Sequence, residues 1–559
     1  MNNLWGRRCR WGGHSCLPFM MNLFLVVQTF LSVGCEDALG TGGTGEHVVP
    51  REQLQHIGSL DLRPSLAATN PSTNPTTQPA PPPAQVTVGI EECRRMALQN
   101  NLDLRVSLFN PVISRTSLTE AEAQFEAVFL GNIAGATSRS PVTPAIIGPR
   151  IDEVTTDSGL EIPLRTGGSV RIDMPLNVVH THLPSPPPET IWNTDPSVTI
   201  TQPLLRGAGL YVNTQGIRIA FYEYQRSAAA TKLEVIRVLA DADRAYWQLY
   251  AARQEQKVRK TAYDSAVAQL ERARRQAKVG VIADVDIVRA ESGVADTVEN
   301  VIIAENDIRQ RQRDLKRILN DPGLPIDADT IVIPSTEPAA FPYDLDVQRL
   351  TAAALKQRTE MLDLELQIAE QTSNVRFARN DMLPLVVMAY TYGVGGLGYT
   401  AGQTFSQAWE KKGDSQTLGL QLQVPIGNEA ARSRLRRAML QRMQALASRE
   451  QQALQIRQDI ANAVDTLRTD WQRIVAAHER AVLSARTLDV EVRQFGLGLR
   501  TSTDVLIAQS DLATAQLAEV SAVSDYQIAQ VDLAFATGTV LGAAHVDWLP
   551  AAEPNVPRY

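Results

Sequence analysis

The chain has 559 residues, of which 44% are hydrophobic and 21% charged, a composition that excludes disorder throughout. Its 54 Lys and Arg residues against 61 Asp and Glu residues give a net charge of -7, which leaves no basic surplus for the phosphates of a nucleic acid. The four cysteines are too few for a disulfide scaffold. After residue 35, no uncharged apolar run reaches the roughly 20 residues that a transmembrane helix requires.

The N-terminus has the pattern of an export signal. Three arginines within the first ten residues precede an apolar stretch over residues 17–33. This stretch runs into LSVGC, which resembles a bacterial lipobox except that Ser32 occupies the usual aliphatic position. We predict a signal peptide over residues 1–35 with lipidation at Cys35, or alternatively cleavage near Ala38 without lipidation. Residues 36–85 are polar and rich in Pro and Thr, and they predict an extended linker.

The rest of the chain is a duplication. A set of five residues recurs at a constant offset of 218, because Gly280, Asp286, Ala290, Ser292 and Ala295 are matched by Gly498, Asp504, Ala508, Ser510 and Ala513. We therefore expect a first repeat over 86–322, a Pro-rich linker over 323–345, a second repeat over 346–538 and a C-terminal tail over 539–559.

Two long proline-free spans predict long helices. Between Pro203 and Pro322, and again between Pro425 and Pro550, apolar residues recur at helical spacing. Each span is broken once near its middle by glycine, at Gly280 and at Gly496 with Gly498. Helices over 210–279 and 428–497 would each contain about 70 residues and measure roughly 105 Å. Shorter helices over 90–123 and 281–321, and over 347–381 and 499–537, would run beside them. A soluble coiled-coil rod would share this helical pattern.

The segments between the helices alternate as strands do. Residues 416–426 read QTLGLQLQVPI, which places apolar residues on one face and mostly polar residues on the other, and residues 197–202 alternate similarly. Weaker alternation occurs at 129–135, 385–394 and 169–178, the last with a possible partner at 153–162. Apolar-outward alternation fits a transmembrane barrel, although a half-buried sheet would also alternate. Four principal strands cannot close a barrel in one chain, so we expect it to be shared between subunits. We interpret 153–178 as an extended extracellular hairpin.

The segment from residue 86 to 538 resembles the TolC-like outer membrane efflux protein family. The resemblance rests on QPLLRGAG at 202–209, VGVIADVD at 279–286 and LGLRTSTDVL at 497–506. It implies a mostly α fold with membrane β structure, in which duplicated helical hairpins of three chains form an α-barrel tunnel. A shared 12-stranded transmembrane β-barrel would cap this tunnel, with four strands from each chain. The protein would reside in the outer membrane of a Gram-negative-type bacterium and extend into the periplasm.

The resemblance also implies a function and candidate site residues. The protein would be the exit duct of a tripartite system, passive itself, with a periplasmic membrane-fusion adaptor and an inner-membrane transporter as partners. The hairpin tips would contact the adaptor through Val279, Gly280, Val281, Leu497, Gly498 and Leu499. A charged gate at the tips would involve Asp286, Phe495, Arg500 and Asp504. Arg500 and Asp504 are expected one turn apart on one helix face, and Phe495 stands where TolC has a tyrosine of its latch.

Other kinds of chemistry have little support in the sequence. His180 and His182 are a weak zinc signal without a nearby third ligand, and no nucleophile, base and acid can be grouped by spacing. We expect no enzyme activity, no cofactor and no metal. Two further hypotheses stay open: a duct dedicated to protein secretion, and a soluble periplasmic coiled-coil scaffold. The substrate cannot be assigned from a broad tunnel surface.

Overall fold

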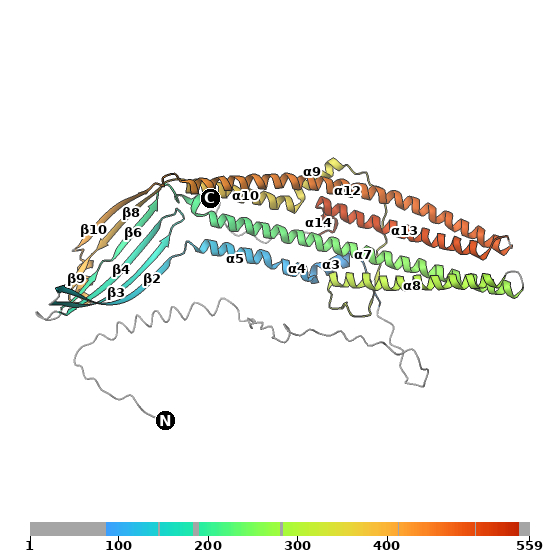
Figure 1. Ribbon diagram of the computed structural model, residues 1–559, viewed down its shortest axis with the longest axis horizontal. Helices are drawn as coiled ribbons and strands as arrows, with labels where there is room; N and C mark the ends of the chain where they lie inside the picture. Colours follow the sequence, from blue (N-terminus) through green and yellow to red (C-terminus); the bar gives the residue numbers. More distant parts are fainter. Residues whose placement is uncertain are drawn as a thin grey trace, which may run out of the picture. The chain divides into compact units, whose positions relative to one another are not determined.

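The computed structural model describes residues 85–143, 146–182, 189–279, 283–411, 413–497 and 499–546. The expected signal peptide, lipidation site and Pro-rich linker fall outside these residues. The described part is mostly helical, with a β-sheet at one end of the helices and two hairpin tips at the other (Figure 1). None of its helices is long and apolar enough to cross a membrane.

The two long helices lie where the proline-free spans predict them. In the first repeat, a short helix α6 (Leu210–Asn213) leads into α7 (Gln215–Lys278), which pairs with α8 (Asp284–Leu319). In the second repeat, α12 (Glu429–Gly496) pairs with α13 (Ser502–Thr537), and α14 (Val540–Ala543) follows. Gly538 at φ 73° ends α13, in a left-handed conformation that glycine adopts readily.

The shorter helices are more divided than expected. The predicted helix over 90–123 consists of α3 (Ile90–Asn100), α4 (Leu102–Ser107) and α5 (Phe109–Ala123). The first break occurs because Asn101 acts as an N-cap, its side chain accepting a hydrogen bond from the Leu104 amide at 2.9 Å. The predicted helix over 347–381 is likewise split into α9 (Val347–Gln357) and α10 (Thr359–Asp381).

Eight strands of the described residues form one sheet. Its main path is β10–β8–β6–β4–β3–β2, with every neighbouring pair antiparallel. The bounds are β2 (Val128–Thr143), β3 (Ile146–Pro163), β4 (Ser169–His182), β6 (Ser197–Pro203), β8 (Leu385–Val394) and β10 (Asp414–Gln423). Two short strands, β5 (Glu189–Thr194) and β9 (Gly396–Gly398), lie off this path beside α11 (Ala401–Trp409).

The sheet contains more strands than the four principal ones expected from the alternation. Strand β4 pairs along its whole length with residues 150–163 of β3, and both strands lie in the path between β2 and β6, so the path has six strands of this chain. The turn that joins β3 and β4 lies beside the helices, where the Gly209 amide at the start of α6 donates to the Thr166 carbonyl at 3.0 Å. The segment 153–178 thus belongs to the sheet, and its turn lies at the end of the sheet next to the helices.

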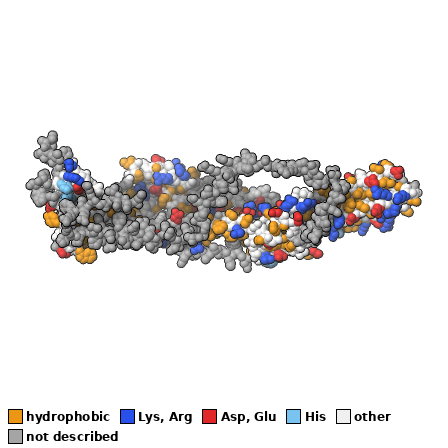
Figure 2. Space-filling model, turned by 90° about the horizontal axis from the view of Figure 1, so that it is seen from below, with side chains coloured by type: hydrophobic (Ala, Val, Ile, Leu, Met, Phe, Trp, Pro, Cys, Tyr) orange, Lys and Arg blue, Asp and Glu red, His pale blue; other side chains and the backbone are white. Residues whose placement is uncertain are grey.

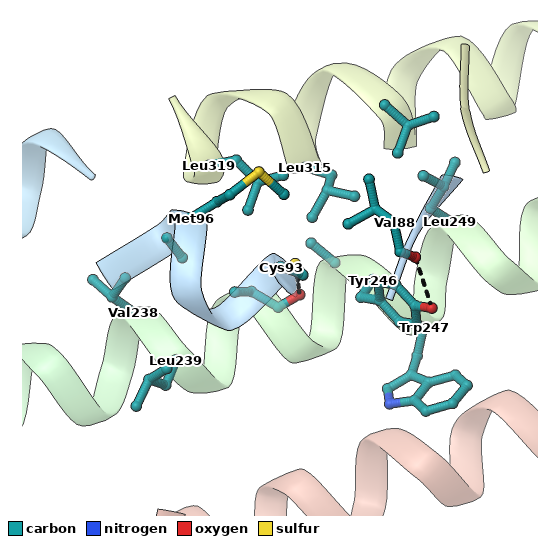
Figure 3. Packing of buried hydrophobic residues seen from close by; sticks show 14 of the residues in the cluster. Val88, Cys93, Met96, Val238, Leu239, Tyr246, Trp247, Leu249, Leu315 and Leu319 are labelled. Carbon is teal, nitrogen blue, oxygen red and sulfur yellow. Dashed lines mark hydrogen bonds between the residues drawn. The ribbon is translucent and has the colours of Figure 1, made fainter. Parts of the chain in front are cut away.

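The main hydrophobic core lies midway along the helices, where α3, α7 and α8 meet (Figure 3). A parallel pair of strands, β1 (Gln85–Val88) and β7 (Ile331–Pro334), packs against it. Tyr246 of α7 is fully buried, and its hydroxyl donates to the Val88 carbonyl at 3.2 Å and accepts from the Thr336 amide at 2.9 Å. Beside it, Arg94 and the buried Asp243 form an ion pair at 2.8 Å between α3 and α7.

Candidate functional site: the sheet faces and the hairpin tips

One face of the sheet is apolar across its width. A single row of the register joins apolar side chains from five strands, namely Tyr392, Val198, Ile172, Leu160 and Phe129. On the sixth strand, β10, the same face continues as Leu418, Leu420 and Leu422, which are each at least 65% exposed. Exposed apolar side chains in this number indicate contact with lipid or with another protein surface.

The opposite face of the same strands is polar. The adjacent row of the register consists of Thr417, Thr391, Thr199, Arg171 and Glu161, and it ends at Val128 on β2. The hydroxyls of Thr199 and Thr391 are 3.0 Å apart, and Arg171 forms an ion pair with Asp173 at 2.8 Å. A sheet that is apolar on one side and polar on the other is what the wall of a membrane barrel requires, since lipid contacts one side and water the other.

The apolar face ends abruptly toward the end of the sheet that is remote from the helices. Beyond Val154 on β3, this face carries Arg150 and Asp152, whose side chains pair at 3.0 Å. His182 on β4 reaches the same carboxylate at 2.9 Å. Neighbouring His180 bonds Thr190 at 2.6 Å, and no group of three metal-binding side chains occurs among the described residues. The two histidines therefore belong to a polar border of the apolar face.

The first tip joins α7 to α8. Val279 is 77% exposed, whereas Gly280 and Val281 lie outside the described residues. Ala283 is the N-cap residue of α8 and has no polar side chain to cap it. Asp286, in the first turn, pairs with Arg289 at 3.3 Å. Further from the tip, Arg274 of α7 and Glu291 of α8 form an ion pair at 2.7 Å that joins the two helices.

The second tip joins α12 to α13. Leu497 and Leu499 are 76% and 72% exposed, and Gly498 between them lies outside the described residues. Phe495 is only 5% exposed, so its ring packs inside the hairpin of this chain. The Leu499 amide donates to the Gln494 carbonyl at 3.0 Å and closes the turn. Apolar and charged side chains both occur at this end of the molecule (Figure 2).

Arg500 and Asp504 do not share a helix face as expected. Helix α13 begins at Ser502, so Arg500 lies in the turn, where it contacts the Gln494 side chain at 3.0 Å and Glu491 at 3.3 Å. The Asp504 carboxylate instead accepts the Thr501 amide at 2.9 Å and the Thr501 hydroxyl at 2.8 Å. This capping box lowers the pKa of Asp504, chiefly through the amide of Thr501. The sequence T-x-x-D at 501–504 already carried that signal.

The two hairpins approach each other a short distance from the tips. A Cβ at Gly293 of α8 would lie 3.0 Å from a methyl group of Leu506 of α13, so these two helices pack closely there. Beside this contact lies an open cavity of about 540 Å³ between α7, α8 and α13. Polar side chains line much of it, among them Arg259, Asp296, Asn300 and Gln509. The hairpins are thus separated by an open, partly polar space beside a narrow contact.

Comparison with known proteins finds similarity to outer membrane efflux proteins. The outer membrane efflux protein profile matches residues 350–539. The chain is 25% identical over 303 residues to the outer membrane efflux protein BepC of Brucella suis. The aligned segment covers 54% of this chain and 63% of BepC. It is 23% identical over 281 residues to TolC of Escherichia coli, and this alignment covers 49% of the chain and 55% of TolC. The chain is thus similar to TolC-like outer membrane efflux proteins, and residues 350–539 match the model of that family.

Solved structures of TolC-like channels have the same fold. The outer-membrane channel OprN superposes with a TM-score of 0.59 at 18% identity, covering 80% of this chain and 90% of OprN. The CmeC channel of Campylobacter jejuni gives a TM-score of 0.58 at 15% identity, covering 80% of this chain and 85% of CmeC. The sequence matches span less than two thirds of BepC and of TolC, so the fold extends further along the chain than the sequence similarity does.

As a TolC-like protein, the chain is an outer membrane protein whose helices extend into the periplasm. The sheet and the hairpin tips lie at opposite ends of the described helices (Figure 1). The family consists of channels and not of enzymes.

Proposed function

We propose that three copies of this chain form a passive exit duct across the periplasm and the outer membrane. The observation that carries this proposal is the sheet, with an exposed apolar face on one side and a polar face on the other. Its outer strands β2 and β10 each leave one edge unpaired within the described chain. Lipid does not tolerate unpaired backbone edges, so β2 of one copy would pair with β10 of the next until the sheet closes.

The duct would work with an adaptor and a transporter. Val279, Leu497 and Leu499 are exposed apolar residues at the two tips, and such residues are suited to bury against a partner. With Gly280, Val281 and Gly498 they would form the surface that meets a periplasmic membrane-fusion adaptor. An inner-membrane transporter bound to that adaptor would supply the energy, and its class would determine the cargo.

The oligomer and the pore can be tested together. The protein is extracted from outer membranes in mild detergent, its mass is measured by light scattering, and its conductance is recorded in planar bilayers. A trimer that conducts supports the duct. A water-soluble rod that does not conduct would overturn it, and a periplasmic scaffold would then replace it.

The adaptor surface requires a separate test. Replacing Leu497 and Leu499 with Asp should abolish export activity in cells while leaving the bilayer conductance unchanged, because the substituted side chains are exposed and fill no core. The matched control is Leu440→Asp, at an exposed leucine of α12. This substitution should leave the export activity and the bilayer conductance unchanged. Export that survives the double substitution at the tip would exclude this contact surface.

We further propose that the tips regulate opening through Asp286, Arg500, Asp504 and Phe495. The Arg500 side chain is 48% exposed, which leaves it accessible to a neighbouring copy, and it contacts Glu491 of α12 at 3.3 Å. Arg500→Ala should raise the single-channel conductance, because an attraction at the closed end is lost. Asp504→Ala should have a smaller effect on conductance, since that carboxylate is already bound by Thr501. An unchanged conductance in both variants would exclude these residues from the gate.

The proposed lipid anchor at Cys35 is tested independently of the channel. Cys35→Ser should abolish the incorporation of labelled palmitate. Labelling that persists in this variant would show that another residue carries the lipid.

A further inference from the structure

The β3–β4 hairpin has the two faces of a membrane strand pair. On β4, Val170, Ile172, Met174, Leu176 and Val178 share the face that carries Val198 and Ile200 of β6. On β3, Ile162, Leu160 and Val154 continue this face. This face extends over 170–178 on β4 and over 154–162 on β3, where Thr156 and Ser158 interrupt it. Both lengths match the roughly 9–11 residues of a strand that crosses a bilayer with a 45° tilt.

The opposite face of the hairpin continues the polar face of its neighbours. Arg171 lies in register with Thr199 of β6, and Glu161 in register with Arg171. Asp157 and Asp173 also belong to this face, so the hairpin adds charged side chains to a face that carries uncharged residues on β6, β8 and β10. In a surface loop that projected from the membrane, water would surround both faces, and the apolar residues would not need to align with the apolar face of the neighbouring strands.

The turn between β3 and β4 is fixed at the helical end of the sheet. Gly167 has φ +92°, and a Cβ there would lie 2.2 Å from the Gly207 carbonyl. A Cβ at Gly168 would lie 2.4 Å from the Thr201 carbonyl. The Thr166 hydroxyl donates to the Gln202 side chain at 2.8 Å. These contacts with the start of α6 and the end of β6 place the turn on the periplasmic side, the side of the helices.

We propose that β3 and β4 are two additional strands of the membrane barrel, so that each chain contributes six strands and the trimer closes 18. This inference rests on the proposed trimeric duct. Barrel diameter grows roughly linearly with strand number, so this barrel would be about 1.5 times as wide as one of 12 strands. The lumen would carry Arg171, Asp173, Glu161 and Asp157 from every copy, and it would therefore present a charged lining to cargo at the membrane level.

The side on which the turn lies provides the first test. Single cysteines are introduced at Thr166, in the turn, at Tyr399, beside α11 at the opposite end of the sheet, and at Val279, at the helical tip. All three native residues are exposed. Native Cys93 is buried, and burial raises its pKa to about 12, so it should not react. The reagent is a maleimide coupled to a polymer too large to pass through the channel.

In intact cells, Tyr399→Cys should be labelled, whereas Thr166→Cys and Val279→Cys should be labelled only after the outer membrane is permeabilised. Labelling of Thr166→Cys in intact cells at the rate of Tyr399→Cys would overturn the inference, because the hairpin would then be an extracellular loop.

The second test compares β4 with β6, position by position. In purified channels, a small water-soluble thiol reagent should label Arg171→Cys and Thr199→Cys, which would face the lumen. The same reagent should not label Ile172→Cys and Val198→Cys, which would face lipid. Loss of the alternation on β4 alone would overturn the inference and leave the duct standing. Loss of the alternation on both strands would overturn the membrane sheet itself, and with it the proposed function.

Discussion

The capping box at the second tip allows a quantitative prediction. In Thr501→Ala, the Asp504 amide loses the Thr501 hydroxyl at 3.4 Å, and the Asp504 carboxylate loses its 2.8 Å contact with that hydroxyl. Removing a threonine N-cap costs about 1 kcal/mol, within a range of 0.5–2 kcal/mol. Because 1.4 kcal/mol corresponds to a tenfold change in an equilibrium constant, the first turn of α13 should open about fivefold more often.

Amide hydrogen exchange measured by mass spectrometry would report this opening. Exchange in the first two turns of α13 should accelerate about fivefold in Thr501→Ala, remain near the native rate in Thr501→Ser, and not change in the middle of α12. Unchanged exchange in Thr501→Ala would refute the reasoning, since the box would then contribute nothing to the order of the tip.

The first tip supplies the reciprocal experiment. Ala283 and Asp286 occupy the positions of Thr501 and Asp504 in the duplicated sequence, but Ala283 cannot cap α8. Ala283→Thr would create the same T-x-x-D pattern there and should slow exchange at the start of α8 by a similar factor. Faster exchange in this variant would show that the local backbone does not accept the cap.

Two further predictions concern ion pairs. Arg94→Met leaves the Asp243 carboxylate buried and unpaired, and should lower the free energy of unfolding by about 3–5 kcal/mol in chemical unfolding. The control Arg95→Met removes an exposed pair and should cost less than about 1 kcal/mol. Equal losses of stability in the two variants would contradict the importance of the buried pair. The hydrogen bond to Glu519 raises the pKa of His478 in the folded protein above its ordinary value of 6.5. The pair of His478 with Glu519 therefore stabilises the fold fully below pH 6.5, and this stabilisation is lost as pH rises through the higher folded pKa. His478→Gln should therefore lower the melting temperature at about pH 5.5 and not at about pH 9, and an equal loss at both would exclude the ion pair.

The helices could be predicted from the sequence because their signals are local. Proline-free spans with apolar residues at helical spacing located α7 and α12, and only their caps remained to be defined. The break at Asn101 was missed because its effect depends on one side chain bonding one amide, which periodicity does not register. Phe495 could be placed near the tip but not inside the hairpin, since its burial depends on contacts between separate helices.

The sheet was harder to predict because its pairing joins distant segments. The alternation in 153–162 is weakened by Thr156 and Ser158, which interrupt the apolar face of β3. Nothing local indicates that β6 pairs with β8 across the two repeats, or that β3 and β4 enter the path between β2 and β6. The resemblance implied four strands per chain. The pairing of β3 and β4 within the sheet path of this chain gives two more.

The pairing of β1 with β7 affects the order in which the chain can fold. The Ile90 amide donates to the Thr336 hydroxyl across 246 residues of sequence, and Tyr246 joins both partners in between. A chain exported N-terminus first cannot complete this core until β7 has crossed the inner membrane. The α7–α8 hairpin, whose contacts are local, can form before then. We expect the N-terminal helices to be the last part of the first repeat to become protected during folding, although they are the first to reach the periplasm.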